Sequence, residues 1–216
     1  MPEPPLVLAS ASPRRHELLG ALGYEFDVVP ADLDEEALTY GRDAIAIARR
    51  LARAKALHVA ASRPGATVLA ADTVVSLRGI LLGKPADADD ARRMLNALSD
   101  RAHRVVTGGA VAAPGAKRPV VSHAVTRVHF RNLSAADIDA WIATGGPFDK
   151  AGAYGVQDAA FSPVARYEGC YCNVMGLPLG EAVRLLDSAG QRPNGGLRPL
   201  AQCNGCPIAP ASGASK

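Results

Sequence analysis

The chain has 216 residues and a formal net charge of +3, from 24 lysines and arginines against 21 acidic residues. This excess is too small to predict a nucleic-acid partner, although a few local cations would suit a small anionic ligand. No run of about 18 apolar residues predicts a membrane span, and the N-terminus lacks the basic and apolar regions of a signal peptide. Hydrophobic residues make up 48% of the chain, which is enough to form a core.

All four cysteines lie in the last quarter of the chain, at positions 170, 172, 203 and 206. Such clustering is a poor disulfide framework, so we expect a cytoplasmic protein. A four-thiolate zinc site is not favoured. The spacing of Cys170 and Cys172 is tighter than in the usual zinc knuckles, and the other two cysteines lie in a segment with the composition of a disordered tail.

The first half of the chain alternates between predicted strands and helices. A strand at 6–9 leads to a helix that begins at Pro13, with Ser12 as its N-cap, and a second strand follows at 24–29. An acidic loop at 32–36 precedes a long helix at 43–61 and a strand at 67–71, which is expected to end in Asp72 and Thr73. A hairpin of 74–77 and 80–82 and a helix at 88–98 complete this half.

The second half is predicted to hold a long hairpin of strands at 103–113 and 119–130, then a helix from the Ser134 cap through Trp141. Residues 145–178 are rich in loops, and a last helix covers 179–188. The pattern predicts an α/β fold with a mixed sheet flanked by helices. We expect one domain at 1–188 and a flexible tail, rich in Gly and Pro, at 189–216.

The first candidate site is the motif Ser10-Ala-Ser12-Pro-Arg14-Arg15 between a strand and a helix. The N-terminus of a helix presents unpaired N–H groups and a partial positive charge, and guanidinium groups suit phosphate oxygens. These residues therefore indicate a phosphate site. The alternative is a capped helix with two solvated arginines.

A pair of acids, Glu35 in the acidic loop and Asp72 after a strand, is the second candidate. Hydrolysis of a phosphoanhydride requires a divalent cation and a group that activates water, and carboxylate oxygens suit Mg²⁺ or Mn²⁺. The alternatives are an Asx-turn at Asp72 and a solvated loop acid at Glu35.

Two lysines are candidates for contact with a polyphosphate. Lys55 shares a helical stripe with Leu51 and Ala48, so its side chain is expected to point toward the protein body, where an ammonium needs a partner. Lys84 lies in a Gly-Lys-Pro turn. A snorkelling Lys55 and an ordinary turn lysine are the alternatives.

Two later segments are candidates for binding a flat ligand. Small residues surround Lys150, Tyr154 and Gln157, and a glutamine amide supplies both a donor and an acceptor for the edge of a base. The segment 169–179 could close a pocket. A purely structural role remains open for both.

Taken in order, the pieces of sequence resemble the Maf family of nucleotide pyrophosphatases. The matching pieces are LASASPRRHELL, Asp34-Glu35, ARAKA at 52–56, ADTV at 71–74, Gly83-Lys84-Pro85, FDKAGAYGVQ at 148–157 and residues 173–179. The resemblance implies an inosine-triphosphatase-like fold with two lobes around a cleft. It also implies metal-assisted hydrolysis of a nucleoside triphosphate to the monophosphate and pyrophosphate.

The resemblance also implies roles for individual residues. Asp72 would activate water and bind the metal together with Glu35, and Lys55 and Lys84 would assist catalysis. The expected substrate-binding residues are Ser10, Ser12, Arg14, Arg15, Thr73, Lys150 and Gln157. Among them, Arg14, Thr73 and Gln157 match positions that the family associates with the choice of base. The segment at 148–157 resembles the branch of the family that acts on dTTP and UTP. Cys170 and Cys172, where the family has serine and commonly an aromatic residue, and Val156 and Asp158 are departures that flank the expected base pocket.

Two alternatives remain at this point: a 7-methyl-GTP-type pyrophosphatase, and a nucleotide-binding regulator of septum formation and cell-division arrest that needs no turnover. The enzyme is favoured because only turnover requires both Glu35 and Asp72. The expected partner is the nucleoside triphosphate, without nucleic acid or membrane, and a homodimer is left open. The tail after Ser188 matches no part of the family pattern.

Overall fold

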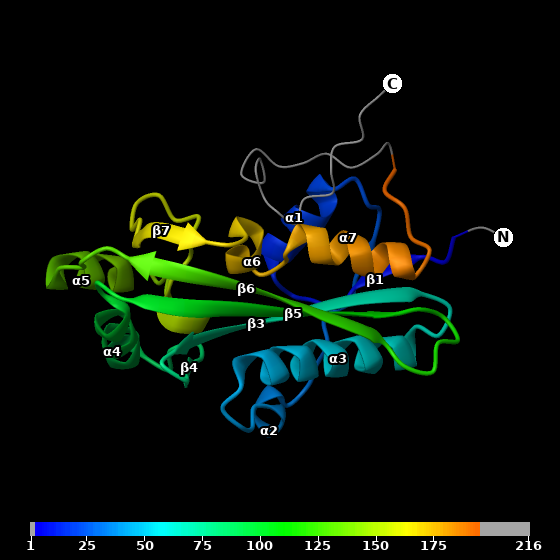
Figure 1. Cartoon of the computed structure of the whole chain (residues 1–216), viewed down its shortest axis with the longest axis horizontal. Helices are drawn as coiled ribbons and strands as arrows, with labels where there is room; N and C mark the ends of the chain where they lie inside the picture. The colour runs from blue at the N-terminus through cyan, green and yellow to red at the C-terminus, as the bar shows by residue number, and fades with distance from the viewer. Residues whose placement is uncertain (1–2, 195–216) are drawn as a thin grey trace.

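The computed structural model describes residues 3–194, which form a seven-stranded sheet with helices on both faces (Figure 1). The strand order is β2-β1-β3-β5-β6-β7, and β4 pairs with part of β3. The strands are β1 (Leu6–Leu8), β2 (Asp27–Val28), β3 (Thr67–Leu77), β4 (Ile80–Leu82), β5 (Ala102–Ala112), β6 (Val120–Phe130) and β7 (Val164–Glu168).

Helices cover both faces of the sheet and also lie at one end of it (Figure 1). One face carries α3 (Ala44–Ser62), and the opposite face carries α1 (Pro13–Ala21), α6 (Tyr171–Met175) and α7 (Leu179–Ser188). At the end of the sheet lie α4 (Ala88–Leu98) and α5 (Ala135–Ala143), and the short elements are α2 (Glu35–Leu38) and the 3-10 turn η1 (Ala151–Ala153). No helix within residues 3–194 is long and apolar enough to cross a membrane.

The sheet is mixed, as predicted. Strand β1 runs parallel to β2 and β3, and all other pairs are antiparallel. The α/β class is therefore confirmed, as are the long hairpin and the helices at 43–61, 88–98 and 179–188, each to within a residue or two.

Strand β3 differs from its prediction because it does not end at Asp72 but continues to Leu77. Pairing with β5 runs without a break from Val68 to Ser76, and these ladder hydrogen bonds outweigh the turn propensity of Asp72 and Thr73. On its other side β3 pairs with β1 only at 67–69 and with β4 only at 75–77. The five residues between these two pairings leave an open edge in the middle of the sheet.

Three further predictions need correction. Glu35 does not lie in a loop, because it begins α2, where the Asp34 carboxylate accepts the N–H of Ala37. The strand expected at 24–29 is reduced to two residues in β2. Ser12 occupies the N-cap position of α1, but its hydroxyl makes no capping hydrogen bond.

The segment expected to be a flexible tail begins against the domain. Gln191 is buried, and its amide donates to the carbonyl of Pro4 and to the Thr67 hydroxyl. The backbone N–H of Asn194 donates to the carbonyl of Gly23. The rest of that segment, with Cys203 and Cys206, lies outside the described residues.

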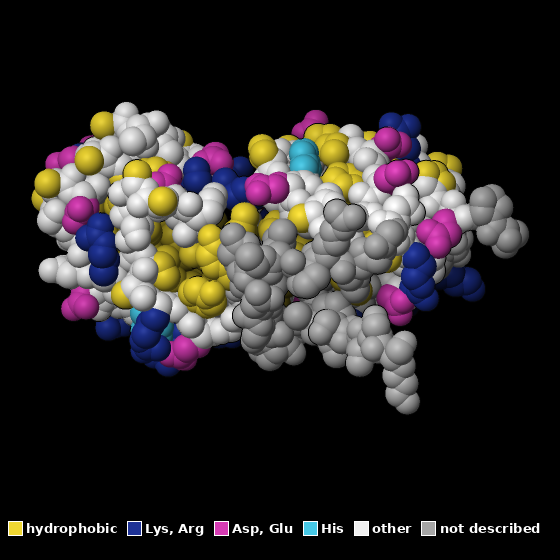
Figure 2. Space-filling view, turned by 90° about the horizontal axis from the view of Figure 1, so that it is seen from above, with side chains coloured by type: hydrophobic (Ala, Val, Ile, Leu, Met, Phe, Trp, Pro, Cys, Tyr) yellow, Lys and Arg dark blue, Asp and Glu magenta, His cyan; other side chains and the backbone are white. Residues whose placement is uncertain are grey.

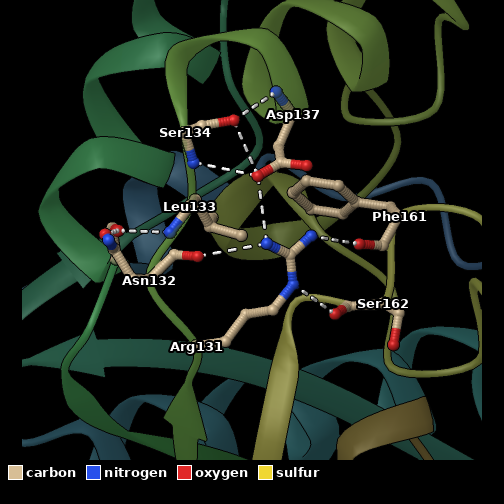
Figure 3. A network of polar contacts seen from close by, with 8 residues as sticks. Arg131, Asn132, Leu133, Ser134, Asp137, Phe161 and Ser162 are labelled. Atoms are coloured by element: carbon tan, nitrogen blue, oxygen red, sulfur yellow. Dashed lines mark hydrogen bonds and ion pairs between the residues drawn. The ribbon is translucent and has the colours of Figure 1, made fainter.

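Arg131 fixes the loop that leads away from the 3-10 turn (Figure 3). Its guanidinium donates to the carbonyls of Phe161 and Ser162 and to the carboxylate of Asp137, which also caps α5 through Ser134. These hydrogen bonds hold the pKa of the Asp137 carboxyl well below its usual range. The end of β6, the start of α5 and the loop before β7 are thereby tied together.

Gly108 allows α3 to lie close against the sheet. A Cβ at this position would stand 2.3 Å from the carbonyl oxygen of Ala48 and 2.7 Å from the backbone nitrogen of Arg49. Gly108 is also the direct partner of Asp72 on the neighbouring strand. The absence of a side chain at 108 therefore sets the distance between α3 and the strand that carries Asp72.

Replacing Gly108 with alanine is expected to lower the free energy of unfolding by at least about 1–3 kcal/mol, because backbone atoms that cannot move aside would have to shift. Gly20→Ala is the matched control. Gly20 lies within α1, and its Cβ would meet no atom within 4 Å. Alanine there should leave stability unchanged or raise it by about 0.5–1 kcal/mol. Urea unfolding of both variants checks the prediction, and equal midpoints would contradict it.

Candidate active site

A pocket of about 840 Å³ lies at the open edge of β3. The space-filling view shows a notch between two lobes, in which Lys and Arg side chains gather (Figure 2). The sequence-predicted site residues all line this pocket: Ser10, Ser12, Arg14, Arg15, Glu35, Lys55, Asp72, Thr73, Lys84, Lys150 and Gln157. The structure therefore brings together residues from both ends of the domain.

Lys55 joins the two predicted acids. Its ammonium lies 2.5 Å from Oδ1 of Asp72 and 2.8 Å from Oε1 of Glu35. Lys55 is 8% exposed and Asp72 is 7% exposed. The helical stripe predicted for Lys55 is thus confirmed, since α3 directs the ammonium into the sheet rather than to solvent.

Burial works against the charge on Asp72. Desolvation raises the pKa of the Asp72 carboxyl above its ordinary value, whereas the charges of Lys55 and Arg15 and the hydrogen bond from Lys55 act to lower it. A carboxylate held in this way is a stronger base than one in water. Desolvation likewise lowers the pKa of Arg15, and the charge of Asp72 opposes that effect.

Arg15 is held by three separate oxygen atoms. Its Nε donates to the carbonyl of Gly176 at 2.8 Å, and its two terminal nitrogens donate to Ser10 Oγ at 3.3 Å and to Thr73 Oγ1 at 3.1 Å. The Ser10 hydroxyl also accepts the N–H of Ser12 at 3.1 Å. Ser10, rather than Ser12, therefore organises the entry to α1.

Asp72 keeps one carboxylate oxygen that Lys55 does not bond. Lys55 donates to Oδ1 of Asp72. Within residues 3–194, no hydrogen bond reaches the other carboxylate oxygen, Oδ2. Those residues contain no cluster of three or more His, Cys, Asp or Glu that could hold a metal ion. Asp72 and Glu35 are pocket carboxylates that could contribute ligands to Mg²⁺ or Mn²⁺, cations that commonly take further ligands from water and substrate phosphate.

An ion pair spans the mouth of the pocket. Nη1 of Arg14, on α1, lies 3.2 Å from a carboxylate oxygen of Asp149, which belongs to the loop before η1. Lys150 contacts the other carboxylate oxygen and donates to the carbonyl of Gly146 at 2.6 Å. Lys84 and Gln157 lie at the exposed rim of the same pocket.

Apolar side chains form the other end of the pocket, where Val75, Val105 and Tyr154 line it. The Tyr154 hydroxyl lies 2.8 Å from Nε2 of the buried His103, and burial lowers the pKa of His103 to about 4. The two rings meet edge to face. Sequence reasoning missed His103, although strand alternation places it on the same face as Val105.

A chain of hydroxyl groups lies behind Thr73. Thr73 Oγ1 is 2.9 Å from Oγ1 of Thr107, its direct partner on β5, and Thr107 Oγ1 donates to the carbonyl of Asn173 at 2.9 Å. The Asn173 side chain is fully buried and donates to the carbonyl of Val105 and to Thr126 Oγ1. Thr107 was also missed, since a single threonine in a buried strand gives no signal of its own.

A cluster of cations, an acid pair and an apolar wall together define a pocket for an anionic ligand that has an apolar part. The family model described as Maf-like protein matches residues 5–189. The chain therefore belongs to the Maf family.

Similar proteins from several bacteria carry the name dTTP/UTP pyrophosphatase. The protein from Thermomicrobium roseum is 50% identical over 98% of this chain and 97% of its own length, and that from Myxococcus xanthus is 52% identical over 86% and 92%. The family model ends at residue 189, as expected for the segment after Ser188, while the alignment with the first relative continues beyond it. A solved HAM1 protein from Coxiella burnetii shows only a weak likeness, with 20% identity, a TM-score of 0.36 and coverage of 58% of this chain and 72% of that one.

Arg15→Lys is expected to lower the free energy of unfolding by about 1–3 kcal/mol, because one ammonium cannot reach all three oxygen atoms and leaves the Gly176 carbonyl without its donor. Arg14→Lys is the control, since its exposed ion pair with Asp149 contributes only about 0–1 kcal/mol. Thermal and urea unfolding of both variants would test the difference. A larger loss in Arg14→Lys would contradict it.

Proposed function

We propose that this protein is a metal-dependent pyrophosphatase that hydrolyses dTTP and UTP, or related pyrimidine nucleotides, to the monophosphate and pyrophosphate. The observation that carries the proposal is the position of Lys55 between Asp72 and Glu35, in one pocket with the N-terminus of α1. The relatives named dTTP/UTP pyrophosphatase support the same substrates.

The phosphates belong at the basic end of the pocket. The N-terminus of α1 offers backbone N–H groups, and Arg15 is pre-oriented by Ser10, Thr73 and Gly176. Lys84 and Arg14 add charge at the rim. Donors fixed before the substrate arrives stabilise the charge that grows on a leaving pyrophosphate.

Asp72 is the proposed base. Burial raises the pKa of its carboxyl, so the carboxylate accepts a proton from water more readily than a solvated aspartate would. Lys55 keeps Asp72 ionised and oriented, and Glu35 balances the charge of Lys55. A bound Mg²⁺ or Mn²⁺ would neutralise phosphate charge and be held by Asp72 and Glu35.

The nucleobase of the substrate belongs at the apolar end of the pocket, where Val75 and Tyr154 form a wall and Gln157 lies at the rim.

Hydrolysis to the monophosphate and pyrophosphate fits a cytoplasmic housekeeping role that removes excess or non-standard nucleotides. A regulator of septation that binds nucleotides without turnover is not favoured. Such a regulator would not need a buried carboxylate that acts as a general base and is paired with a lysine.

The proposal is tested by incubating the protein with a panel of ordinary and modified nucleoside triphosphates, 7-methyl-GTP included, with Mg²⁺, Mn²⁺ or a chelator. We expect pyrophosphate and the monophosphate from dTTP and UTP, and no product with the chelator. Asp72→Asn should fold normally and lose roughly 100- to 10,000-fold in turnover.

Asp139→Asn is the matched control, because Asp139 is exposed, pairs with Arg92 and does not line the pocket. Its turnover should equal that of the unaltered chain. Release of orthophosphate alone would indicate a plain phosphatase, and binding without any product would favour the regulator. Full activity in Asp72→Asn would remove Asp72 from the role of base.

Lys55→Met is expected to move the acid limb of the pH profile of kcat/KM upward by about one unit or more, since an opposite charge at this distance shifts a pKa by that amount. Lys55 lowers the pKa of Asp72, so its removal makes the carboxyl harder to ionise and activity is lost at a higher pH.

Lys84→Met provides the comparison for the pH profile. Lys84 is exposed at the rim and makes no described contact with Asp72. This variant should lower kcat/KM at every pH without moving the limb. Should residual activity of Lys55→Met be too low to follow, the carboxyl resonance of Asp72 can be titrated by NMR. An unchanged limb, or an unchanged titration, would refute the role of Lys55.

A further inference from the structure

The Thr107 hydroxyl donates its hydrogen to the backbone carbonyl of Asn173. Thr107 Oγ1 lies 2.9 Å from the backbone carbonyl of Asn173, and a carbonyl oxygen can only accept. A hydroxyl carries a single hydrogen. Thr107 therefore donates to Asn173 and can offer only a lone pair to Thr73, 2.9 Å away on the neighbouring strand.

The direction of the hydrogen bonds at Thr73 follows from this. The Thr73 hydroxyl must donate its own hydrogen to Thr107, because otherwise two lone pairs would face each other at 2.9 Å. One lone pair of Thr73 accepts from Arg15, whose guanidinium has donors only. What Thr73 can still offer to the pocket is one lone pair and no hydrogen.

Thr73 lies in the pocket lining, so a ligand there meets a hydroxyl that can accept a hydrogen bond but not donate one. Thr73 is partly exposed, and it lies two residues before Val75 on the same face of β3. Val75 belongs to the apolar end and Arg15 to the basic end. A flat base against Val75 therefore brings a ring edge toward the Thr73 oxygen.

We propose that Thr107, which does not touch the substrate, is a positioning residue that makes Thr73 an obligate hydrogen-bond acceptor and so selects bases with a ring N–H. Uracil and thymine carry a hydrogen on ring nitrogen N3, whereas cytosine has a lone pair there. The inference rests on the proposed function and adds the means by which the same pocket distinguishes two pyrimidines of nearly equal size.

Asn173 keeps this arrangement rigid. Its side chain is fully buried and anchored by hydrogen bonds to Val105 and Thr126, so its own carbonyl cannot turn away from Thr107. Gly176, the C-cap of the same helix α6, adds a second restraint. With a φ of 111°, a side chain at 176 would be strained, and its Cβ would stand 3.3 Å from both Thr73 Oγ1 and Arg15 Nε.

Thr107→Val is the decisive variant, because valine has the shape of threonine without the hydroxyl. The Thr73 hydrogen is then released and can be donated to N3 of cytosine. The ratio of kcat/KM for UTP to that for CTP should fall about tenfold or more, the range expected when a buried hydrogen-bond constraint is removed. Thr107→Ser keeps the hydroxyl and should retain the ratio.

A double-mutant cycle separates positioning from a merely structural effect. Thr73→Val removes the acceptor itself and should lower the ratio, after which Thr107→Val should change it no further. A purely structural role for Thr107 would lower both rates together and leave the ratio unchanged. If Thr107→Val does not fold, Thr107→Cys takes its place, because a thiol is a weak donor.

Affinities for α,β-methylene analogues of UTP and CTP, measured by calorimetry, make the test independent of turnover. An unaltered chain that prefers the UTP analogue but hydrolyses nothing would overturn the proposed function and leave this inference standing. Hydrolysis of UTP with an unchanged ratio in Thr107→Val, an equal loss in Thr107→Ser, or no preference in the unaltered chain would overturn the inference.

Discussion

The contact of Lys55 with Asp72 is the interaction on which the site depends. An aspartate in the middle of a buried strand is unfavourable unless a cation lies beside it, and Lys55 on α3 supplies a directly bonded one. The helix reaches that position because Gly108 leaves its backbone room against the sheet. The close packing of α3 against the sheet is therefore what allows Lys55 to reach Asp72.

The open edge of β3 turns this local contact into a pocket. Neighbouring strand residues point to opposite faces, so Asp72 faces α3 while Thr73 faces α1 and α6. In a fully paired strand the two side chains would be separated by the sheet. Because neither β1 nor β4 pairs with this stretch, both side chains line one space. The acid pair on one face and the fixed Arg15 on the other can then act on one ligand.

Much of this was accessible from the sequence. Hydrophobic spacing predicted α3 and the inward direction of Lys55, and the phosphate motif at Ser10 to Arg15 was placed correctly at a junction of strand and helix. The continuity of β3 could not be predicted, because it depends on pairing with β5, a strand that is distant in the sequence and pairs Gly108 with Asp72. Thr107 and His103 were missed for a related reason. Thr107 bonds Asn173 and His103 bonds Tyr154, and both partners lie in distant segments of the chain. The local sequence pattern around Thr107 and His103 does not indicate these partners.

The link between Arg14 and Asp149 has a consequence for how a ligand enters. Exposed ion pairs are weak, so this bridge across the mouth opens readily and more readily as ionic strength rises. An approaching polyphosphate attracts Arg14 and repels Asp149, and its own charge exchanges one partner of the arginine for another. An anionic ligand therefore gains Arg14 as a partner on entry, whereas a neutral molecule offers that guanidinium nothing in exchange for Asp149.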